Sequence, residues 1–198
     1  MNTLAKTILE RTEGLPEGAT ICAKELLHLG SRAAVDQALS RLVKRGYFMR
    51  VSRGVYVRPV ESRFGKRAPS ASAVVEYVAG IKGETVAPHG AAAANKLGLT
   101  TQVPVRSVYL TSGPSRRLKL GSEVVELRHA PRWQLALGNH PAGEVLRALA
   151  WLGPEKAVEA LLALKHKLSS QELNEIASAR AVLPSWLAKQ VSEVVVNG

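Results

Sequence analysis

Side chains able to read nucleic acid gather in residues 31–44, where basic and small polar residues recur at helical spacing. The apolar residues of this segment return every three or four positions, so they fall on one face of a helix and leave the opposite face polar. Arginine donates two parallel hydrogen bonds to guanine, and glutamine pairs similarly with adenine. The predicted DNA contacts on this face are Ser31, Arg32, Ala33, Gln37, Ser40, Arg41 and Lys44. Asp36, on the same face, can accept from a cytosine amine or orient its helical neighbours.

A second basic group follows directly, in a segment that predicts a short β-hairpin. Residues 48–58 alternate in hydropathy around a turn at Ser52-Arg53-Gly54. Arg50 and Arg53 lie on this hairpin, where arginines typically bind phosphates, contacts that fix position without reading sequence. Lys44, at the end of the helix, is expected to do the same.

The elements before this segment favour a helix-turn-helix. Residues 2–12 predict an amphipathic helix, and Thr20 is expected to cap a second short helix. A turn at 28–30 contains glycine, and Ser31 is placed to cap the next helix. Residues 1–60 therefore predict a winged helix-turn-helix whose last helix enters a major groove. The alternative is an ordinary helix and hairpin of a small α+β domain, with a solvated basic face.

Charge and composition support a polyanionic partner. The chain of 198 residues has a net charge of +11 and a pI of about 10.2. Residues 1–67 hold 13 Lys and Arg against 6 Asp and Glu, a net charge of +7, whereas residues 68–198 hold 14 against 10, a net charge of +4. The basic residues do not border a strongly apolar helix, which disfavours a membrane surface.

The location expected from the sequence is the cytoplasm. No apolar run approaches the ~18 residues of a membrane span, and the N-terminus lacks the pattern of a secretion signal. Cys22 is the only cysteine, so the chain forms no internal disulfide and is expected to carry no cysteine-based metal site.

The rest of the chain predicts a second domain. Residues 61–72 are rich in Gly, Pro, Ser and basic residues and indicate a linker. Residues 73–198 predict a small antiparallel sheet followed by a helical bundle, so the fold class is α+β and mostly helical. A second basic surface is expected on the sheet, formed by Arg116, Arg117, Lys119 and Arg128. It would contact nucleic acid or an acidic protein, or simply face solvent.

No residue pattern indicates catalysis. The five histidines never fall at a metal-ligand spacing, and the sequence has no hydrolase, zinc-protease or nucleotide-binding motif. We therefore expect no catalytic residues, metal or cofactor, and do not expect an enzyme.

Over nearly its whole length the chain resembles the AbiEi antitoxin family. The resemblance rests on ATICAKELLHLGSRAAVDQALSRLVKRG, RGVYVRP, SRFGKRAPS, APHGAAAANKLGLTTQVP and YLTSGPSRRLKLG. The run from Ala87 to Pro104 and the YLTSG segment are the most diagnostic, since other winged helices lack them. His89 departs from the pattern, which more often has a small residue such as serine there.

The resemblance implies a bacterial antitoxin encoded beside a nucleotidyltransferase-like toxin. The winged helix would bind inverted repeats in its own promoter and repress the operon, as a dimer or as cooperative monomers. The second domain would counteract the toxin, in many family accounts without a stable complex. By correspondence, DNA contact falls to Ser31, Arg32, Gln37, Ser40, Arg41, Arg50 and Arg53. An antitoxin that holds its toxin directly, or an RNA-binding module that uses the sheet, are the alternatives.

Overall fold

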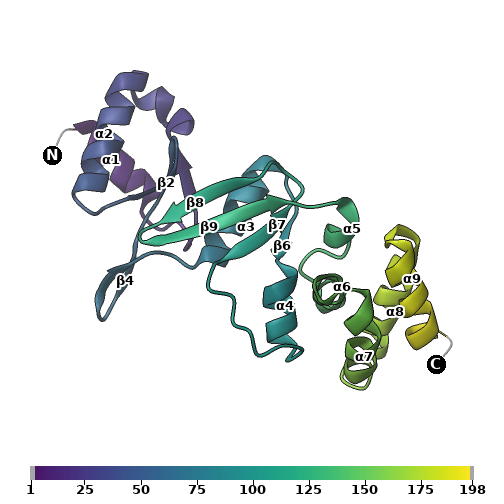
Figure 1. Ribbon diagram of the computed structural model, residues 1–198. Helices are drawn as coiled ribbons and strands as arrows, with labels where there is room; N and C mark the ends of the chain where they lie inside the picture. The colour runs from purple at the N-terminus through teal and green to yellow at the C-terminus, as the bar shows by residue number, and fades with distance from the viewer. Residues whose placement is uncertain (1–2, 197–198) are drawn as a thin grey trace. The chain divides into compact units, whose positions relative to one another are not determined.

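The computed structural model describes residues 3–196 and is an α+β protein in which helices predominate (Figure 1). The chain divides into two compact units. The first runs up to Glu84 and includes Arg116–Glu126, and the second holds Thr85–Ser115 and the chain from Leu127 onward. This division differs from the predicted boundaries at residues 60 and 73, because the helix after residue 70 belongs to the first unit.

The first unit begins with alternating helices and short strands. Its elements are α1 (Thr3–Thr12), β1 (Thr20–Cys22), the 3₁₀ helix η1 (Ala23–Leu29), α2 (Arg32–Lys44), β2 (Met49–Ser52), β3 (Val55–Val57), β4 (Val60–Ser62), β5 (Gly65–Arg67), α3 (Ala71–Lys82) and β8 (Arg116–Leu120). Strands β1, β3 and β2 form an antiparallel sheet in that order, and Val57 pairs with Thr20 on one side and Met49 on the other. Thr20 thus lies in a strand, and the second helix, capped at Cys22 instead of Thr20, starts two residues later than expected.

The sequence of α2 sets its limits as predicted. The Ser31 Oγ accepts a hydrogen bond from the Ala34 N–H at 3.3 Å and so caps the helix. Beyond the last turn, Gly46 has a φ of +73°, and the N–H of Tyr47 donates to the Leu42 carbonyl at 2.9 Å. A left-handed glycine with this hydrogen bond is the Schellman ending of a helix. The apolar face packs into the core of the unit, which contains Ile8, Val35, Leu39, Leu42, Phe48 and Tyr56.

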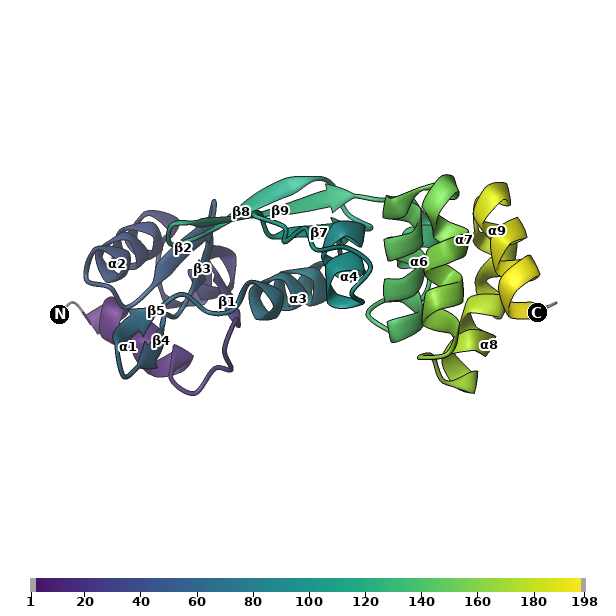
Figure 2. The same cartoon turned by 60° about the horizontal axis from the view of Figure 1, so that its bottom comes forward.

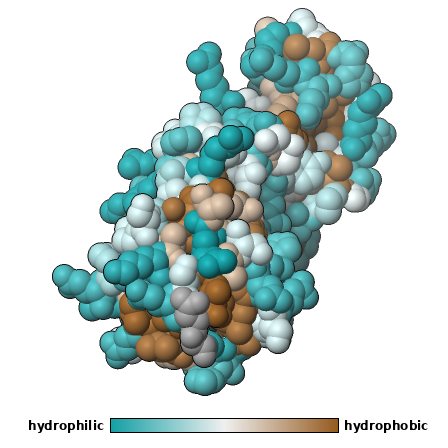
Figure 3. All heavy atoms as spheres, turned by 90° about the vertical axis from the view of Figure 1, so that its right-hand side faces the viewer, coloured by the Kyte–Doolittle hydropathy of each residue, from teal (hydrophilic) through white to brown (hydrophobic). Residues whose placement is uncertain are grey.

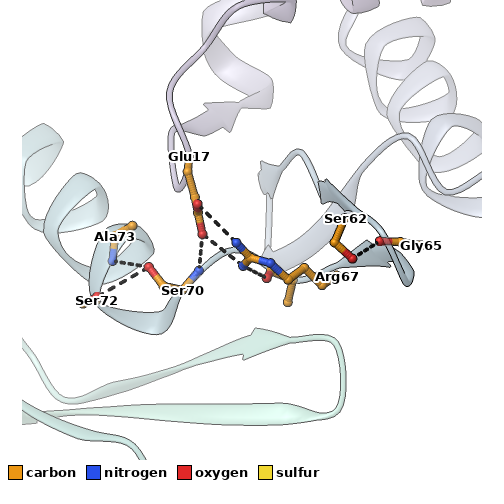
Figure 4. Close-up of polar contacts among 8 residues, drawn as sticks. Glu17, Ser62, Gly65, Arg67, Ser70, Ser72 and Ala73 are labelled. Atoms are coloured by element: carbon orange, nitrogen blue, oxygen red, sulfur yellow. Dashed lines mark hydrogen bonds and ion pairs between the residues drawn. The ribbon is translucent and has the colours of Figure 1, made fainter.

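The segment predicted as a linker, residues 61–72, is a folded hairpin that leads into α3. Strands β4 and β5 pair from Val60 with Arg67 to Ser62 with Gly65. The Glu17 carboxylate accepts hydrogen bonds from the Arg67 guanidinium at 3.2 Å and from the Ser70 N–H at 2.8 Å (Figure 4). These bonds lower the pKa of Glu17, and that from the Ser70 N–H has the larger effect. The linker prediction was therefore wrong in structure, because the same residue types also build tight turns.

The second unit combines strands with a helical bundle. Its elements are β6 (Val86–Pro88), α4 (Gly90–Lys96), β7 (Val108–Thr111), α5 (Arg132–Leu135), α6 (Pro141–Leu152), α7 (Pro154–Lys165), α8 (Ser170–Ser178), the 3₁₀ turn η2 (Ala179–Val182), α9 (Ser185–Val191) and a π-helical end, η3 (Ser192–Val196). Strand β9 (Glu123–His129) runs through the boundary of the two units, and the sheet order is β6-β7-β9-β8.

The bundle core agrees largely with the apolar pattern. Helices α6, α7 and α9 lie side by side (Figure 2), and their buried side chains include Leu146, Leu149, Leu161, Leu187 and Val191. Leu162 is 51% exposed, because it lies one position beyond the buried row of α7.

Candidate nucleic-acid interface

The polar face of α2 is open to solvent over its whole length. Its apolar face is covered, since Val35, Leu39 and Leu42 are buried within the unit. Every residue predicted as a DNA contact on α2 and the β2–β3 hairpin is exposed: Ser31, Arg32, Ala33, Gln37, Ser40, Arg41, Lys44, Arg50 and Arg53. The structure therefore brings the predicted residues to an accessible surface of the first unit.

Small and polar residues occupy the middle of this face. Ala33, Gln37, Ser40 and Lys44 follow one another at spacings of four, three and four residues, which aligns them in a row along the helix. The short side chains at 33 and 40 let another molecule approach the helix backbone closely. Arg41 stands beside this row. The face can thus combine close approach at its centre with charge at its edge.

At the start of α2, an acidic neighbour orients Arg32. The Arg32 Nε donates to the Asp36 Oδ2 at 2.8 Å, and both side chains are about half exposed. Of the two roles considered for Asp36, accepting from a cytosine amine or orienting a helical neighbour, the structure shows the second. An exposed pair of this kind contributes no more than about 0.5 kcal/mol to stability, so its effect is on the direction of the guanidinium.

The turn between β2 and β3 lies next to the same end of α2. A Cβ placed on Gly54 would be 4.0 Å from the Arg32 Nη2, and the Ala23 N–H donates to the Gly54 carbonyl at 2.9 Å. Gly54 has a φ of +72°, a conformation that glycine adopts without strain. Arg53, in this turn, is thus held near the N-terminus of α2.

The second basic surface is not a continuous open patch. Arg116 is largely buried, and its guanidinium forms a two-pronged ion pair with the Glu84 carboxylate, with one N–O distance of 3.1 Å. The prediction that Arg116 belongs to an exposed basic surface was therefore wrong. Arg117 is exposed but lies 3.3 Å from the Glu126 carboxylate. Lys119 is exposed on β8, and Arg128 is exposed in the second unit.

Further basic residues, outside the set predicted to contact DNA on α2 and the β2–β3 hairpin, lie near the C-terminus of α2. Arg45 is exposed directly after the helix. In the β4–β5 hairpin, the Lys66 Nζ donates to the Gly46 carbonyl at 3.3 Å and lies 5.1 Å from the centre of the Tyr47 ring. The glycine at 65, after Arg63 and Phe64, is a turn signal that was available in the sequence.

Burial shifts the pKa of three further titratable groups, His89, Arg147 and Cys22. His89 caps α4, since its Nδ1 accepts from the Ala91 N–H at 3.2 Å, and burial lowers its pKa. Arg147 is 1% exposed and donates to the Gln134 and Gly138 carbonyls; burial lowers its pKa to about 10, so it stays charged at neutral pH. Cys22 is half-buried, which raises its pKa and keeps the thiol protonated.

Two kinds of site are absent from the described part of the chain. Between residues 3 and 196, no three His, Cys, Asp or Glu side chains come close enough to bind a metal ion together. Within the same range, every helix is too short or too polar to traverse a bilayer.

Comparison with known proteins identifies a family and a related fold. Among curated proteins, none matches the sequence significantly. The crystal structure of the Rv2827c protein from Mycobacterium tuberculosis is similar, with a TM-score of 0.55 and 15% identity over 98% of this chain and 77% of that chain, so the likeness concerns the fold. The family model of DUF6088, described as a family of unknown function, matches residues 7–176. The chain belongs to the DUF6088 family.

Proposed function

We propose that the first unit is a winged helix-turn-helix that binds double-stranded DNA. The order helix, strand, two helices and hairpin, with β3 between β1 and β2, supports this assignment. The observation that carries it is the exposed face of α2, which is polar and basic and has an arginine-bearing hairpin at its N-terminal end.

In this proposal α2 enters the major groove. Gln37, Ser40 and Arg32 contact base edges, and the short side chain of Ala33 lets the helix come close to the floor of the groove. Four basic side chains bind phosphates on either side and set the register: Arg41, Lys44, Arg50 and Arg53.

We further propose that the protein is the autorepressor and antitoxin of a bacterial operon whose neighbouring gene encodes a nucleotidyltransferase-like toxin. The resemblance to AbiEi antitoxins supports this step. The protein would act in the cytoplasm by binding and not by catalysis. Two copies, as a weak dimer or as cooperative monomers, would occupy an inverted repeat upstream of its own gene.

Titration of a labelled duplex from that upstream region tests the DNA-binding proposal. Changing Arg32→Ala and Arg53→Ala together is expected to weaken binding at least tenfold, since each good arginine contact contributes ~1–3 kcal/mol. The matched control changes two exposed lysines of the second unit, Lys156→Ala and Lys167→Ala. Equal affinity for wild type and the arginine variant, or no preference over a random duplex, would overturn the proposal.

A toxin-binding antitoxin is the second candidate, and exposed apolar side chains of the second unit favour it. Leu162 is 51% and Val182 is 55% exposed. The face on the side of the last helices shows hydrophobic atoms between hydrophilic ones (Figure 3). A stable 1:1 complex with the neighbouring gene's product on size-exclusion chromatography would support this candidate, and independent migration at micromolar concentrations would exclude it.

A further inference from the structure

The tip of the β4–β5 hairpin carries an aromatic side chain that the first unit does not bury. Phe64 is 87% exposed. It occupies the two-residue turn between Ser62 and Gly65, whose hydroxyl and carbonyl are joined at 2.6 Å. A turn of this size needs no phenylalanine, since a polar residue would satisfy the same backbone. One exposed apolar side chain does not by itself mark an interface, but a ring held in solvent by a closed turn is free to contact another molecule.

The surroundings of Phe64 define the chemistry of that molecule. The Arg63 guanidinium lies 4.7 Å from the centre of the ring, and Lys66 and Arg67 follow in the next strand. Lys66 and Arg67 have acidic partners within the unit, Glu61 and Glu17, whereas Arg63 is exposed beside the ring. A flat apolar face beside an exposed cation fits sugars and bases flanked by phosphates.

The hairpin is fixed to the C-terminal end of α2. Lys66 binds the Gly46 carbonyl and covers the Tyr47 ring. At its base, Arg67 is held by Glu17. Figure 1 shows the hairpin as an arm that projects from the unit below α2. Its tip is therefore positioned by the contacts that Lys66 and Arg67 of β5 make with the rest of the unit.

The two hairpins thus attach to opposite ends of α2. The β2–β3 turn lies beside Arg32, and Lys66 contacts the carbonyl of Gly46. At a rise of ~1.5 Å per residue, the 13 residues of α2 separate its ends by about 18 Å. A major groove is ~12 Å wide, so if α2 crosses the groove its two ends, with the hairpins attached to them, would lie near the flanking backbones.

We propose that the β4–β5 hairpin is a second DNA-binding element, in which Arg63 contacts a phosphate and the Phe64 ring packs into the adjacent minor groove. This inference rests on the proposed DNA binding of α2. An apolar side chain in a minor groove widens it and unstacks a base step, which favours flexible pyrimidine–purine steps at that flank.

The test compares three single variants on the upstream duplex. Phe64→Ala is expected to weaken binding about tenfold with an unchanged salt dependence, because the ring carries no charge. Arg63→Ala should reduce the slope of log K against log[salt] by about 0.9. The matched control is Ile81→Ala, which removes a 50% exposed apolar side chain from α3 of the same unit and should leave binding unchanged. Circular dichroism melting confirms that each variant is folded.

Hydroxyl-radical footprinting separates this inference from the proposed function. Wild type should protect the minor groove on one flank of each half-site. Phe64→Ala should lose that protection and keep the protection at the centre of the half-site. If Phe64→Ala and Arg63→Ala bind like wild type while Arg32→Ala with Arg53→Ala does not, the hairpin inference fails and the function stands. If Phe64→Ala impairs only binding to the toxin, the hairpin is a protein-binding element and the inference is overturned. If wild type binds no duplex, both proposals fall.

Discussion

The salt dependence expected for the proposed DNA binding follows from the pairing of the charges on the candidate interface. Among the described residues, none of Arg41, Lys44, Arg50 and Arg53 forms an ion pair, whereas Arg32 is paired with Asp36 at 2.8 Å. A cation already neutralised by a carboxylate releases fewer counterions from DNA. Asp36→Asn removes the charge and keeps the shape, so it frees Arg32 to act as one more phosphate-binding cation.

The expected magnitude comes from counting these cations. Each phosphate neutralised contributes about −0.9 to the slope of log K against log[salt], so four unpaired cations give about −3.6 for each bound copy. Affinity should then fall by about 150-fold between 50 and 200 mM salt. The hairpin arginine, Arg63, would bring the slope to about −4.5. Asp36→Asn should steepen the slope of wild type by about 0.9 and reduce the preference for the upstream site, because Arg32 loses its orientation.

Fluorescence anisotropy at several salt concentrations measures both quantities, on the upstream duplex and on a random one. Glu159→Gln, which removes one exposed negative charge from α7, is the control and should leave the slope unchanged. A wild-type slope shallower than −1 would refute the reasoning that this surface binds phosphates. A slope unchanged by Asp36→Asn, with full preference for the upstream site, would refute the role given to the Arg32–Asp36 pair.

Three further predictions concern stability, each measured by thermal or denaturant unfolding. Burial holds the pKa of His89 below the ordinary 6.5, so neutral His89 should make its full contribution to the free energy of unfolding above about pH 6.5, and this contribution should fall as the pH drops below that value. His89→Asn keeps a cap and should flatten this dependence. Gly90→Ala should destabilise by ~1–3 kcal/mol because its Cβ would lie 2.3 Å from an α6 carbonyl, whereas Gly80→Ala, in open space within a helix, should stabilise by up to ~1 kcal/mol. Leu39→Ala should cost ~2–5 kcal/mol, and exposed Leu162→Ala less than ~0.5 kcal/mol. Equal effects within either pair, or a pH profile unchanged in His89→Asn, would contradict these assignments.

Local signals were enough to predict α2 and its exposed face. The cap at Ser31 and the glycine at 46 act within one turn of the helix, and the apolar spacing fixes which side is buried. Strand β1 could not be found in this way, because three residues at 20–22 gain their stability from β3, more than 30 positions later. Local reasoning fails where the partner is distant in sequence.

The same cause explains the errors in the candidate site. Arg116 pairs with Glu84, which lies 32 residues earlier in the sequence. Nothing near Arg116 in the sequence indicates that its guanidinium has an acidic partner. The β4–β5 hairpin depends on Glu17, which lies 50 residues before Arg67. At position 89, where the resemblance to AbiEi antitoxins predicts a small residue such as serine, the His89 ring nitrogen caps α4 as a serine hydroxyl would.

The arrangement of charge on α2 separates two properties of the proposed interface. Unpaired cations stand at its edge and on the hairpin, where they would add affinity for any duplex. The centre is nearly uncharged, since Ala33, Gln37 and Ser40 precede the only lysine of that row. Discrimination between sequences must therefore come from a few short-range contacts and from the oriented Arg32. Changes at the centre should alter which site is bound, and changes at the edge should alter how tightly all sites are bound.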